Sequence, residues 1–273
     1  MQPEQPSDPE VQTVQTPSGP ASYTDEGPRD PAKPAFVAVH GLPGSSRDFR
    51  WLGAALEPSR RFVRLNMPGF GGTPLATMRR ASLAARADWV SSVVSALELQ
   101  QPVLLGHSMG GAVAAAACAR HPGRFGGLAL LASVGPEPHQ SVRRMSVPPQ
   151  AISAVLRVPG VARLLENRLA SEFERSGFKG WTTLQHVHSL HCLAALRFSE
   201  HAQNLDRLRL PTFVAWTQDD PFIEEAISER LYWRCPAGPR VCFAAGGHNL
   251  QKTRAVELAE ALTAWSLPSG QVV

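Results

Sequence analysis

The sequence predicts an α/β protein built on a doubly wound, mostly parallel sheet. Short runs of almost wholly apolar residues recur along the chain, separated by stretches with helical periodicity. Strands that are apolar on both faces belong to a sheet covered on both sides, and helices between them make the sheet parallel. One connection of about eighty residues is far longer than an ordinary loop. It indicates a helical insertion in the sheet domain.

The strands can be located from these runs. Residues 1–10 are expected to form a flexible tail. Residues 11–15 then alternate apolar and polar side chains like a half-buried strand, up to a turn at 17–19. Residues 21–24 are the expected hairpin partner. The following apolar runs are the expected strands of the parallel sheet: 36–39, 62–65, 103–105, 128–131, 213–216 and 241–243.

The helices follow from the periodicity between the strands. In the sheet domain they are expected at 46–56, 83–99, 109–120, 224–233 and 250–265. Within the long connection, helical periodicity is found at 152–156, 161–173 and 181–196. We therefore predict a core made of residues 11–135 and 206–267, carrying a lid of short helices at 136–205.

Composition excludes several classes of protein. With 43% hydrophobic and 18% charged residues in 273, the chain is neither disordered nor fibrous. The net charge of +4 arises from scattered pairs such as Arg60-Arg61, so no nucleic-acid partner is expected. No apolar run is long enough to span a membrane, and the first residues lack the features of a secretory signal, which favours a cytoplasmic protein. The cysteines lack zinc-ligand spacing and are expected to be reduced thiols: Cys118, Cys192, Cys235 and Cys242.

The segment 103–111 carries the strongest functional signal. An apolar strand runs into Gly106-x-Ser108-x-Gly110, and an alanine-rich helix follows. Such a sharp turn forces the serine into a strained conformation, and side chains two residues away on either side would collide. At the helix N-terminus, backbone N–H groups and the positive end of the helix dipole face any oxyanion that forms. Ser108 is therefore the predicted nucleophile.

In these features the chain resembles the α/β-hydrolase family. His40-Gly-Leu-Pro-Gly44 follows the first parallel strand, as the oxyanion-loop motif of the family does. Residues 66–72 are similar to the Asp-x-Pro-Gly-x-Gly turn of the family, with Asn66 in place of a usually structural aspartate. The resemblance covers about residues 11–267 and implies the α/β-hydrolase fold with a helical lid. The geometry of the sharp turn at Ser108, called the nucleophile elbow, supplies the backbone N–H of Met109 to an oxyanion hole. The resemblance adds the backbone N–H of Leu42.

A serine hydroxyl needs a base to take its proton and a carboxylate to orient that base. Of the nine histidines, His248 lies in a glycine-flanked loop after the last strand, where active sites of such sheets collect and where the family has its catalytic histidine. Asp219 and Asp220 both follow the strand 213–216 in the required chain order. The family pattern aligns Asp220 with the acid, although Thr217 and Glu224 replace a glycine and a proline of that pattern. Glu137 is a third candidate, because some relatives place the acid after the preceding strand.

Other histidines are expected to be structural. His40 and His107 occupy positions that face the packed interior of this fold. On a helix only residues three or four apart share a face, so His186 and His188 diverge and, with His191, do not suggest a metal site. No metal and no cofactor is expected. Apolar side chains of the lid are candidates for either an acyl pocket or helix packing: Met145, Phe173, Phe178, Trp181, Leu190 and Phe198.

The leading functional prediction is a serine hydrolase that cleaves an ester, or a related acyl bond, of a small and partly apolar substrate through an acyl-enzyme on Ser108. A serine at the elbow disfavours epoxide hydrolases and haloalkane dehalogenases, which resemble this chain but use aspartate there. Hydrolysis of a carbon–carbon bond in a vinylogous diketone is the alternative within the fold. The alternative without catalysis is a protein that binds a ligand in the same pocket. The predicted partner is a small acyl compound, and the sequence specifies no oligomeric state.

Overall fold

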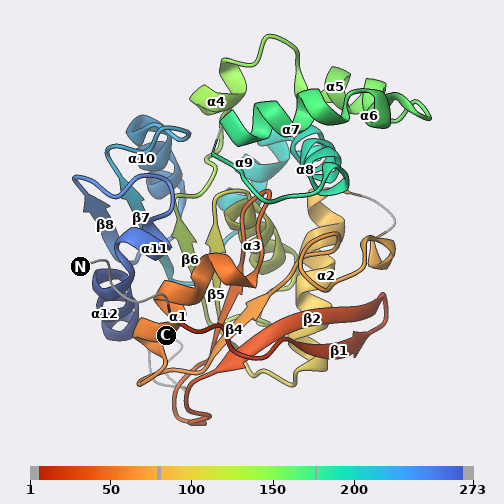
Figure 1. The fold of residues 1–273 in the computed structure, drawn as a ribbon. Helices are drawn as coiled ribbons and strands as arrows, with labels where there is room; N and C mark the ends of the chain where they lie inside the picture. The colour runs from red at the N-terminus through yellow and green to blue at the C-terminus, as the bar shows by residue number, and fades with distance from the viewer. Residues whose placement is uncertain (1–5, 79–80, 176, 267–273) are drawn as a thin grey trace.

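The computed structural model describes residues 6–78, 81–175 and 177–266. An eight-stranded sheet crosses the molecule in the order β1-β2-β4-β3-β5-β6-β7-β8, with helices on both faces (Figure 1). The strands are β1 (Gln12–Thr16), β2 (Gly19–Glu26), β3 (Phe36–Val39), β4 (Phe62–Leu65), β5 (Val103–His107), β6 (Gly127–Leu131), β7 (Thr212–Thr217) and β8 (Arg240–Phe243). β1 and β2 form the expected antiparallel hairpin, and β2 also pairs antiparallel with β4. From β4 to β8 every pair is parallel, which confirms the predicted fold class.

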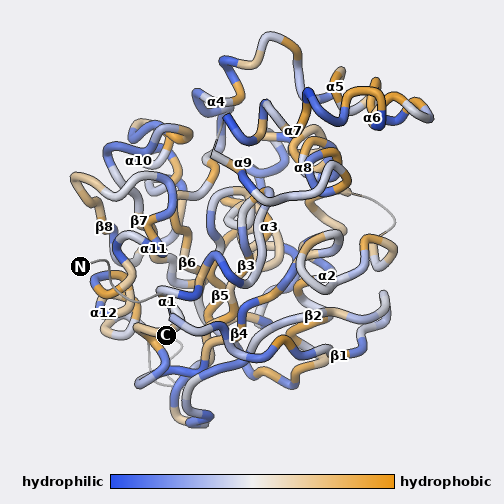
Figure 2. The backbone as a smooth tube through the Cα atoms, in the orientation of Figure 1, coloured by the Kyte–Doolittle hydropathy of each residue, from blue (hydrophilic) through white to orange (hydrophobic). Residues whose placement is uncertain are grey.

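Alternation along each strand divides the core into two layers. In β3, Val37 and Val39 pack into one layer, whereas Phe36 and Ala38 pack into the other. The first layer is covered by α2 (Leu83–Ala96), α3 (Met109–Arg120) and α10 (Glu225–Arg234), and the second by α1 (Arg50–Leu56), α11 (Leu250–Thr253) and α12 (Ala255–Trp265). Figure 2 shows the hydrophobic residues along the central strands between these helices. Both faces of β3 and β6 are buried, which is why their sequences are apolar throughout.

Three expected helices of the core differ in their bounds by more than one residue. The one expected at 46–56 begins as a 3-10 turn, η1 (Ser46–Phe49), before α1. The one expected at 83–99 ends at Ala96, and Glu98 just beyond it has a positive φ of 53°. The helix expected at 250–265 is interrupted at Arg254, whose φ of −127° and ψ of 31° separate α11 from α12. A further 3-10 turn, η2 (Leu75–Thr77), precedes α2.

Within the described residues, short helices fill the long connection between β6 and β7. They are α4 (Gln140–Arg143), α5 (Pro149–Leu156), α6 (Val161–Leu164), α7 (Glu166–Arg175), α8 (Thr183–Ala195) and α9 (Phe198–Asp206), and they gather on one side of the sheet domain (Figure 1). The three predicted helical stretches are present, although the middle one is divided into α6 and α7. The prediction missed α4 and α9. The buried face of α9 includes His201 and Asn204, so it lacks an apolar period.

The N-terminal segment contacts the sheet domain. Residues 6–10 form no helix or strand, but Asp8 lies 3.5 Å from the guanidinium of Arg64 on β4. Arg64 is fully buried and also pairs with Glu26 at 3.0 Å. Residues 1–5 of the expected tail and residue 267 of the expected core lie outside the described residues. None of the helices in the described ranges is long and apolar enough to cross a membrane.

Candidate active site

Ser108 forms the turn between β5 and α3. Its φ of 54° and ψ of −124° lie in a region that residues with a side chain rarely adopt. The flanking glycines are required by close backbone approach. A Cβ on Gly106 would lie 2.5 Å from the carbonyl oxygen of Gly110, and a Cβ on Gly110 would collide with the carbonyl group of Val39. The elbow can therefore form only with glycine at both positions.

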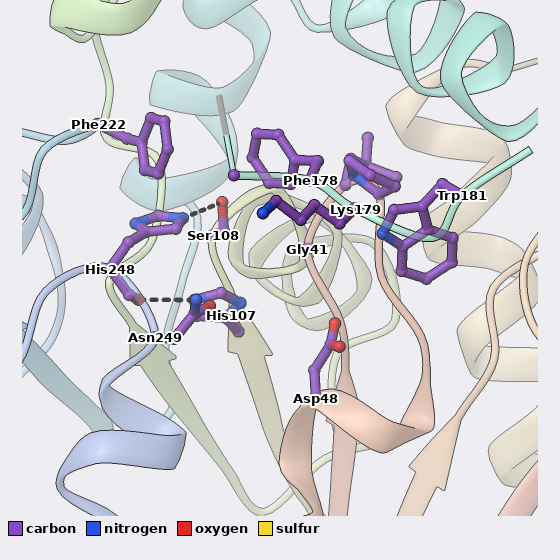
Figure 3. Close-up of a pocket in the computed structure, with 13 residues that line it drawn as sticks. Gly41, Asp48, His107, Ser108, Phe178, Lys179, Trp181, Phe222, His248 and Asn249 are labelled. Atoms are coloured by element: carbon purple, nitrogen blue, oxygen red, sulfur yellow. Dashed lines mark hydrogen bonds between the residues drawn. The ribbon is translucent and has the colours of Figure 1, made fainter. Parts of the chain in front are cut away.

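A chain of hydrogen bonds joins Ser108, His248 and Asp220. The Ser108 hydroxyl lies 2.9 Å from Nε2 of His248 (Figure 3), and Nδ1 of the same ring lies 2.8 Å from Oδ2 of Asp220. The other carboxylate oxygen of Asp220 accepts the backbone N–H groups of Phe222 and Ile223, at 2.8 and 3.0 Å. Because the carboxylate can only accept, Nδ1 carries the proton and Nε2 is left to accept from the serine hydroxyl.

The electrostatics keep Asp220 ionised. Burial alone would raise the pKa of this carboxyl group. The hydrogen bond and the electrostatic interaction with His248, together with the two backbone N–H groups, outweigh burial and hold the pKa below its usual value. The charge of Asp220 is therefore present at neutral pH, next to the ring that it orients.

The two other candidate acids lie elsewhere. Asp219 accepts the backbone N–H groups of Gly246 and Gly247 at 2.9 and 2.8 Å, which lower the pKa of its carboxyl group. It therefore shapes the loop that carries His248. Glu137 is exposed and pairs with Arg230 on α10. In the part of the chain that the structure describes, neither carboxylate hydrogen-bonds to His248.

His40, just after β3, and His107, the last residue of β5, form hydrogen bonds with backbone groups. Nε2 of His107 donates to the carbonyl oxygen of His248 at 2.9 Å, and burial lowers the pKa of His107 to about 3. Nε2 of His40 accepts the N–H of Met67 at 3.0 Å, while its Nδ1 donates to Gly41 at 2.7 Å. Burial lowers the pKa of His40 to about 4. Both rings are therefore neutral at pH 7, and both are buried in the packed interior, as expected.

Asn66 makes structural contacts in place of the family's aspartate. Its Oδ1 accepts the backbone N–H of Ser46 at 2.8 Å, and its Nδ2 donates to Oγ of Ser22 at 3.1 Å. A Cβ on Gly71 would collide with the Asn66 side chain, so the turn closes tightly over it. The amide thus joins the turn to β2 and to η1.

The two departures from the pattern around Asp220 also have partners. The Thr217 hydroxyl donates to the carbonyl oxygen of Gly247 at 3.0 Å, which supports the histidine loop. Glu224 accepts the backbone N–H of Gln140 at 2.7 Å and pairs with Arg143 at 2.6 Å. Glu224 therefore links the loop after β7 to α4, the first helix of the insertion.

A cavity of about 230 Å³ opens beside Ser108. Its lining residues come from the loops after β3, β5, β7 and β8 and from the segment between α7 and α8 (Figure 3). They are Gly41, Leu42, Pro43, Asp48, His107, Ser108, Gly177, Phe178, Lys179, Trp181, Phe222, His248 and Asn249. Of the apolar lid residues considered from the sequence, Phe178 and Trp181 line this cavity. The others do not: Met145, Phe173, Leu190 and Phe198.

Two free backbone donors flank the serine. Leu42 lines the cavity, and Met109 is the first residue of α3, directly after Ser108. Across the described ranges, neither N–H has a hydrogen-bond acceptor in the protein. Met109 lies at a helix N-terminus, which carries a partial positive charge, so its N–H is placed to face a negative charge at the serine.

Two charged groups in the cavity were missed by the sequence reasoning. Asp48 lies in η1, and one of its carboxylate oxygens accepts the N–H of Ser45 at 3.1 Å. Burial raises the pKa of Asp48 to about 7. Lys179 lies in the segment between α7 and α8. No motif surrounds either residue, so only the fold shows that both line the cavity beside Ser108.

The three histidines of the helical insertion make separate contacts, and Nδ1 of His191 lies 2.7 Å from Oγ of Ser153. His186 stacks on Phe173 with ring centroids 4.2 Å apart. His188 donates from Nε2 to the carbonyl oxygen of Pro68 at 3.0 Å. The described residues contain no group of three or more histidine, cysteine or acidic side chains that could hold a metal ion, and their four cysteines are free thiols.

Comparison with known proteins agrees with this architecture. Residues 34–158 match the family described as alpha/beta hydrolase fold. A 2-hydroxy-6-oxononadienedioate/2-hydroxy-6-oxononatrienedioate hydrolase of Paraburkholderia phymatum is 25% identical over 84% of this chain and 84% of its own. A thermophilic esterase from Thermogutta terrifontis has a TM-score of 0.70 at 20% identity, covering 94% of this chain and 97% of its own. Carboxylesterase CesB from Bacillus subtilis has a TM-score of 0.65 at 17% identity, covering 96% and 92%. These likenesses confirm the fold expected from the sequence.

Proposed function

We propose that the chain is a serine hydrolase of the α/β-hydrolase superfamily that cleaves a carboxylic ester of a small, partly apolar substrate. The supporting observation is the hydrogen-bond chain from Asp220 through His248 to Ser108, with Ser108 in a strained turn at the cavity wall. A nucleophile, a base and an orienting acid in this order are what acyl transfer requires.

In the first step, Ser108 Oγ attacks the ester carbonyl carbon while Nε2 of His248 takes the hydroxyl proton. The carbonyl oxygen becomes an oxyanion, which the N–H groups of Leu42 and Met109 bind. When this intermediate collapses, the bond to the leaving oxygen breaks and His248 returns its proton to the alcohol. Each oxyanion donor is expected to contribute about 100-fold or more to the rate.

In the second step, water attacks the acyl-enzyme. His248 accepts a proton from this water, and the ester bond to Ser108 breaks after a second oxyanion has formed. The proton then passes from His248 to Oγ, which restores the serine and releases the carboxylic acid. Asp220 stabilises the imidazolium in both steps, because its carboxylate lies 2.8 Å from Nδ1.

The cavity limits the size of the acyl or alcohol portion. Pockets for drug-sized ligands measure about 300–1,000 Å³, and this cavity is smaller at about 230 Å³. Phe178, Trp181 and Phe222 supply apolar walls. We therefore expect activity on p-nitrophenyl esters to be highest for acetate to butyrate and to fall for octanoate and decanoate.

Hydrolysis of a carbon–carbon bond is the second candidate. It is favoured by the 25% identity to the hydrolase of Paraburkholderia phymatum, whose name specifies a dienedioate substrate. The same serine, histidine and aspartate would serve. Loss of the visible absorbance of a vinylogous dienoate, without hydrolysis of any simple ester, would favour this candidate over the esterase.

The decisive test is covalent labelling. A fluorophosphonate should add one adduct to the wild-type chain, detected by intact mass, and none to Ser108→Ala. Turnover of p-nitrophenyl esters should disappear in the same variant. If correctly folded wild-type protein forms no adduct, the serine is not activated and a non-catalytic binding role replaces this proposal.

A further inference from the structure

A lysine on the segment between α7 and α8 faces the proposed nucleophile. Lys179 lines the cavity, and its side chain extends across it with the amino end toward Ser108 (Figure 3). Among the described lining residues it is the one with a permanent positive charge, since the only other charged or ionisable groups there are Asp48, His107 and His248. His107 is neutral at pH 7 because burial lowers its pKa to about 3.

Aromatic contacts fix the backbone on both sides of this lysine. The ring of Phe178 lies 5.7 Å from that of Phe222, which in turn packs edge-on against His248 at 5.1 Å. Trp181 contacts Phe70 at 6.1 Å between ring centroids. These contacts position residue 179 over the cavity, so the amino group operates within a restricted space near the reacting atoms.

Lys179 has no ion-pair partner among the described residues. Asp48 lies in the wall of the same cavity but forms no salt bridge with Lys179. The carboxylate of Asp48 instead accepts the N–H of Ser45. An unpaired ammonium group beside apolar walls leaves room for an anionic group that arrives with the substrate.

From this arrangement we propose that the enzyme prefers esters that carry a free carboxylate, which Lys179 binds while the ester carbonyl meets Ser108. The proposal deepens the proposed esterase function and rests on it. A single lysine suits a monoanion, whereas a phosphate dianion calls for several cations or for the bidentate fork of arginine. Asp48 opposes the anion whenever it is ionised, so it further disfavours groups of higher charge.

Matched pairs of esters test this preference. In the first pair, 4-carboxyphenyl acetate is compared with 4-carbamoylphenyl acetate, which has the same shape without the charge. In the second pair, ethyl hydrogen succinate is compared with ethyl succinamate, so the charge lies on the acyl side. We expect the ratio of kcat/KM, acid over amide, to exceed one for at least one pair. In Lys179→Met that ratio should fall about fivefold or more, as for loss of a charge-assisted hydrogen bond.

The controls separate local from general effects. Lys252→Met removes the same charge from α11, one turn beyond Asn249, and Lys252 does not line the cavity. Its ratio should remain that of the wild type. Asp48→Asn keeps the shape of the side chain and removes its charge, so it should raise the ratio. A melting temperature and a far-UV circular dichroism spectrum equal to those of the wild type show that each variant is folded.

The possible failures are distinguishable. A wild-type ratio at or below one in both pairs, or a ratio that Lys179→Met leaves unchanged while hydrolysis continues, overturns the carboxylate preference alone. An absence of hydrolysis for all four esters, together with an absence of fluorophosphonate labelling, overturns the proposed function on which it rests.

Discussion

Replacing Asp220 by asparagine should abolish most of the activity by changing which nitrogen of His248 carries its proton. The side chain at this position faces two fixed donors, because one oxygen accepts the N–H groups of Phe222 and Ile223. In the variant the amide oxygen must take that place, which directs the amide NH₂ group at Nδ1 of His248. Nδ1 then has to accept, so Nε2 carries the proton and can no longer take one from Ser108.

The size of this effect follows from the loss of the base. An aspartate-to-asparagine change that leaves the geometry intact but reverses the tautomer lowers kcat about 10⁴-fold in serine proteases. At about 1.36 kcal/mol per tenfold, the activation free energy rises by about 5.4 kcal/mol. The assay is steady-state hydrolysis of p-nitrophenyl butyrate, accompanied by the rate of fluorophosphonate labelling.

Asp219→Asn is the matched control. Oδ1 of Asp219 accepts the N–H groups of both Gly246 and Gly247. An asparagine keeps such an oxygen, so we expect kcat/KM within about tenfold of the wild type, the loss of one charge-assisted hydrogen bond at most. The reasoning is refuted if folded Asp220→Asn retains more than about 1% of kcat, or if Asp219→Asn is equally damaging.

Three further predictions concern stability. Gly106→Ala should unfold the chain or lower the free energy of unfolding by about 3 kcal/mol or more, because the new Cβ collides with the backbone of α3. Gly123→Ala, where the new Cβ has open space around it, should lower the free energy of unfolding by about 1 kcal/mol. Equal melting temperatures for the two variants would contradict this prediction. Burial lowers the pKa of His201 from 6.5 to about 4, so the unfolded chain binds more protons than the folded chain as pH falls from 6.5 to 4. The free energy of unfolding should therefore drop by about 3 kcal/mol over this window. His201→Gln should make the free energy of unfolding less dependent on pH in an acid denaturation experiment. Arg64→Met should lower the free energy of unfolding by about 3–5 kcal/mol, because it leaves Glu26 buried without its partner. The double variant with Glu26→Gln should recover most of this loss, as measured by urea denaturation.

Much of the fold could be predicted from the sequence because the strands are buried on both faces. The runs at 36–39 and 62–65 coincide with β3 and β4, since an apolar pattern that serves two layers leaves little ambiguity. Helix interruptions were less predictable. The break at Arg254 lies inside a continuous apolar period, and its cause is a local backbone geometry that the pattern does not record.

At the site, chain order and spacing indicated Ser108 and His248 but left Asp219 and Asp220 open, and the resemblance to the family favoured Asp220. The structure joins Ser108, His248 and Asp220 by hydrogen bonds. The function of Asp219 in holding two glycine N–H groups had no sequence signal beyond its position. Lys179 and Asp48 could not be predicted as neighbours of Ser108, because they come from a connecting segment and a 3-10 turn whose approach is decided by tertiary packing.

The contact between Glu224 and α4 determines how the helical insertion can be exchanged. Glu224 lies four residues after Asp220 and is held by the backbone N–H of Gln140 and by Arg143. A chimera that grafts a foreign insertion at 136–205 would keep the sheet domain intact yet remove both partners. The acid loop would then lose an anchor although no residue of the loop had changed. Retaining residues 140–143 from this chain, and joining the foreign segment after them, is therefore the graft most compatible with an intact Asp220.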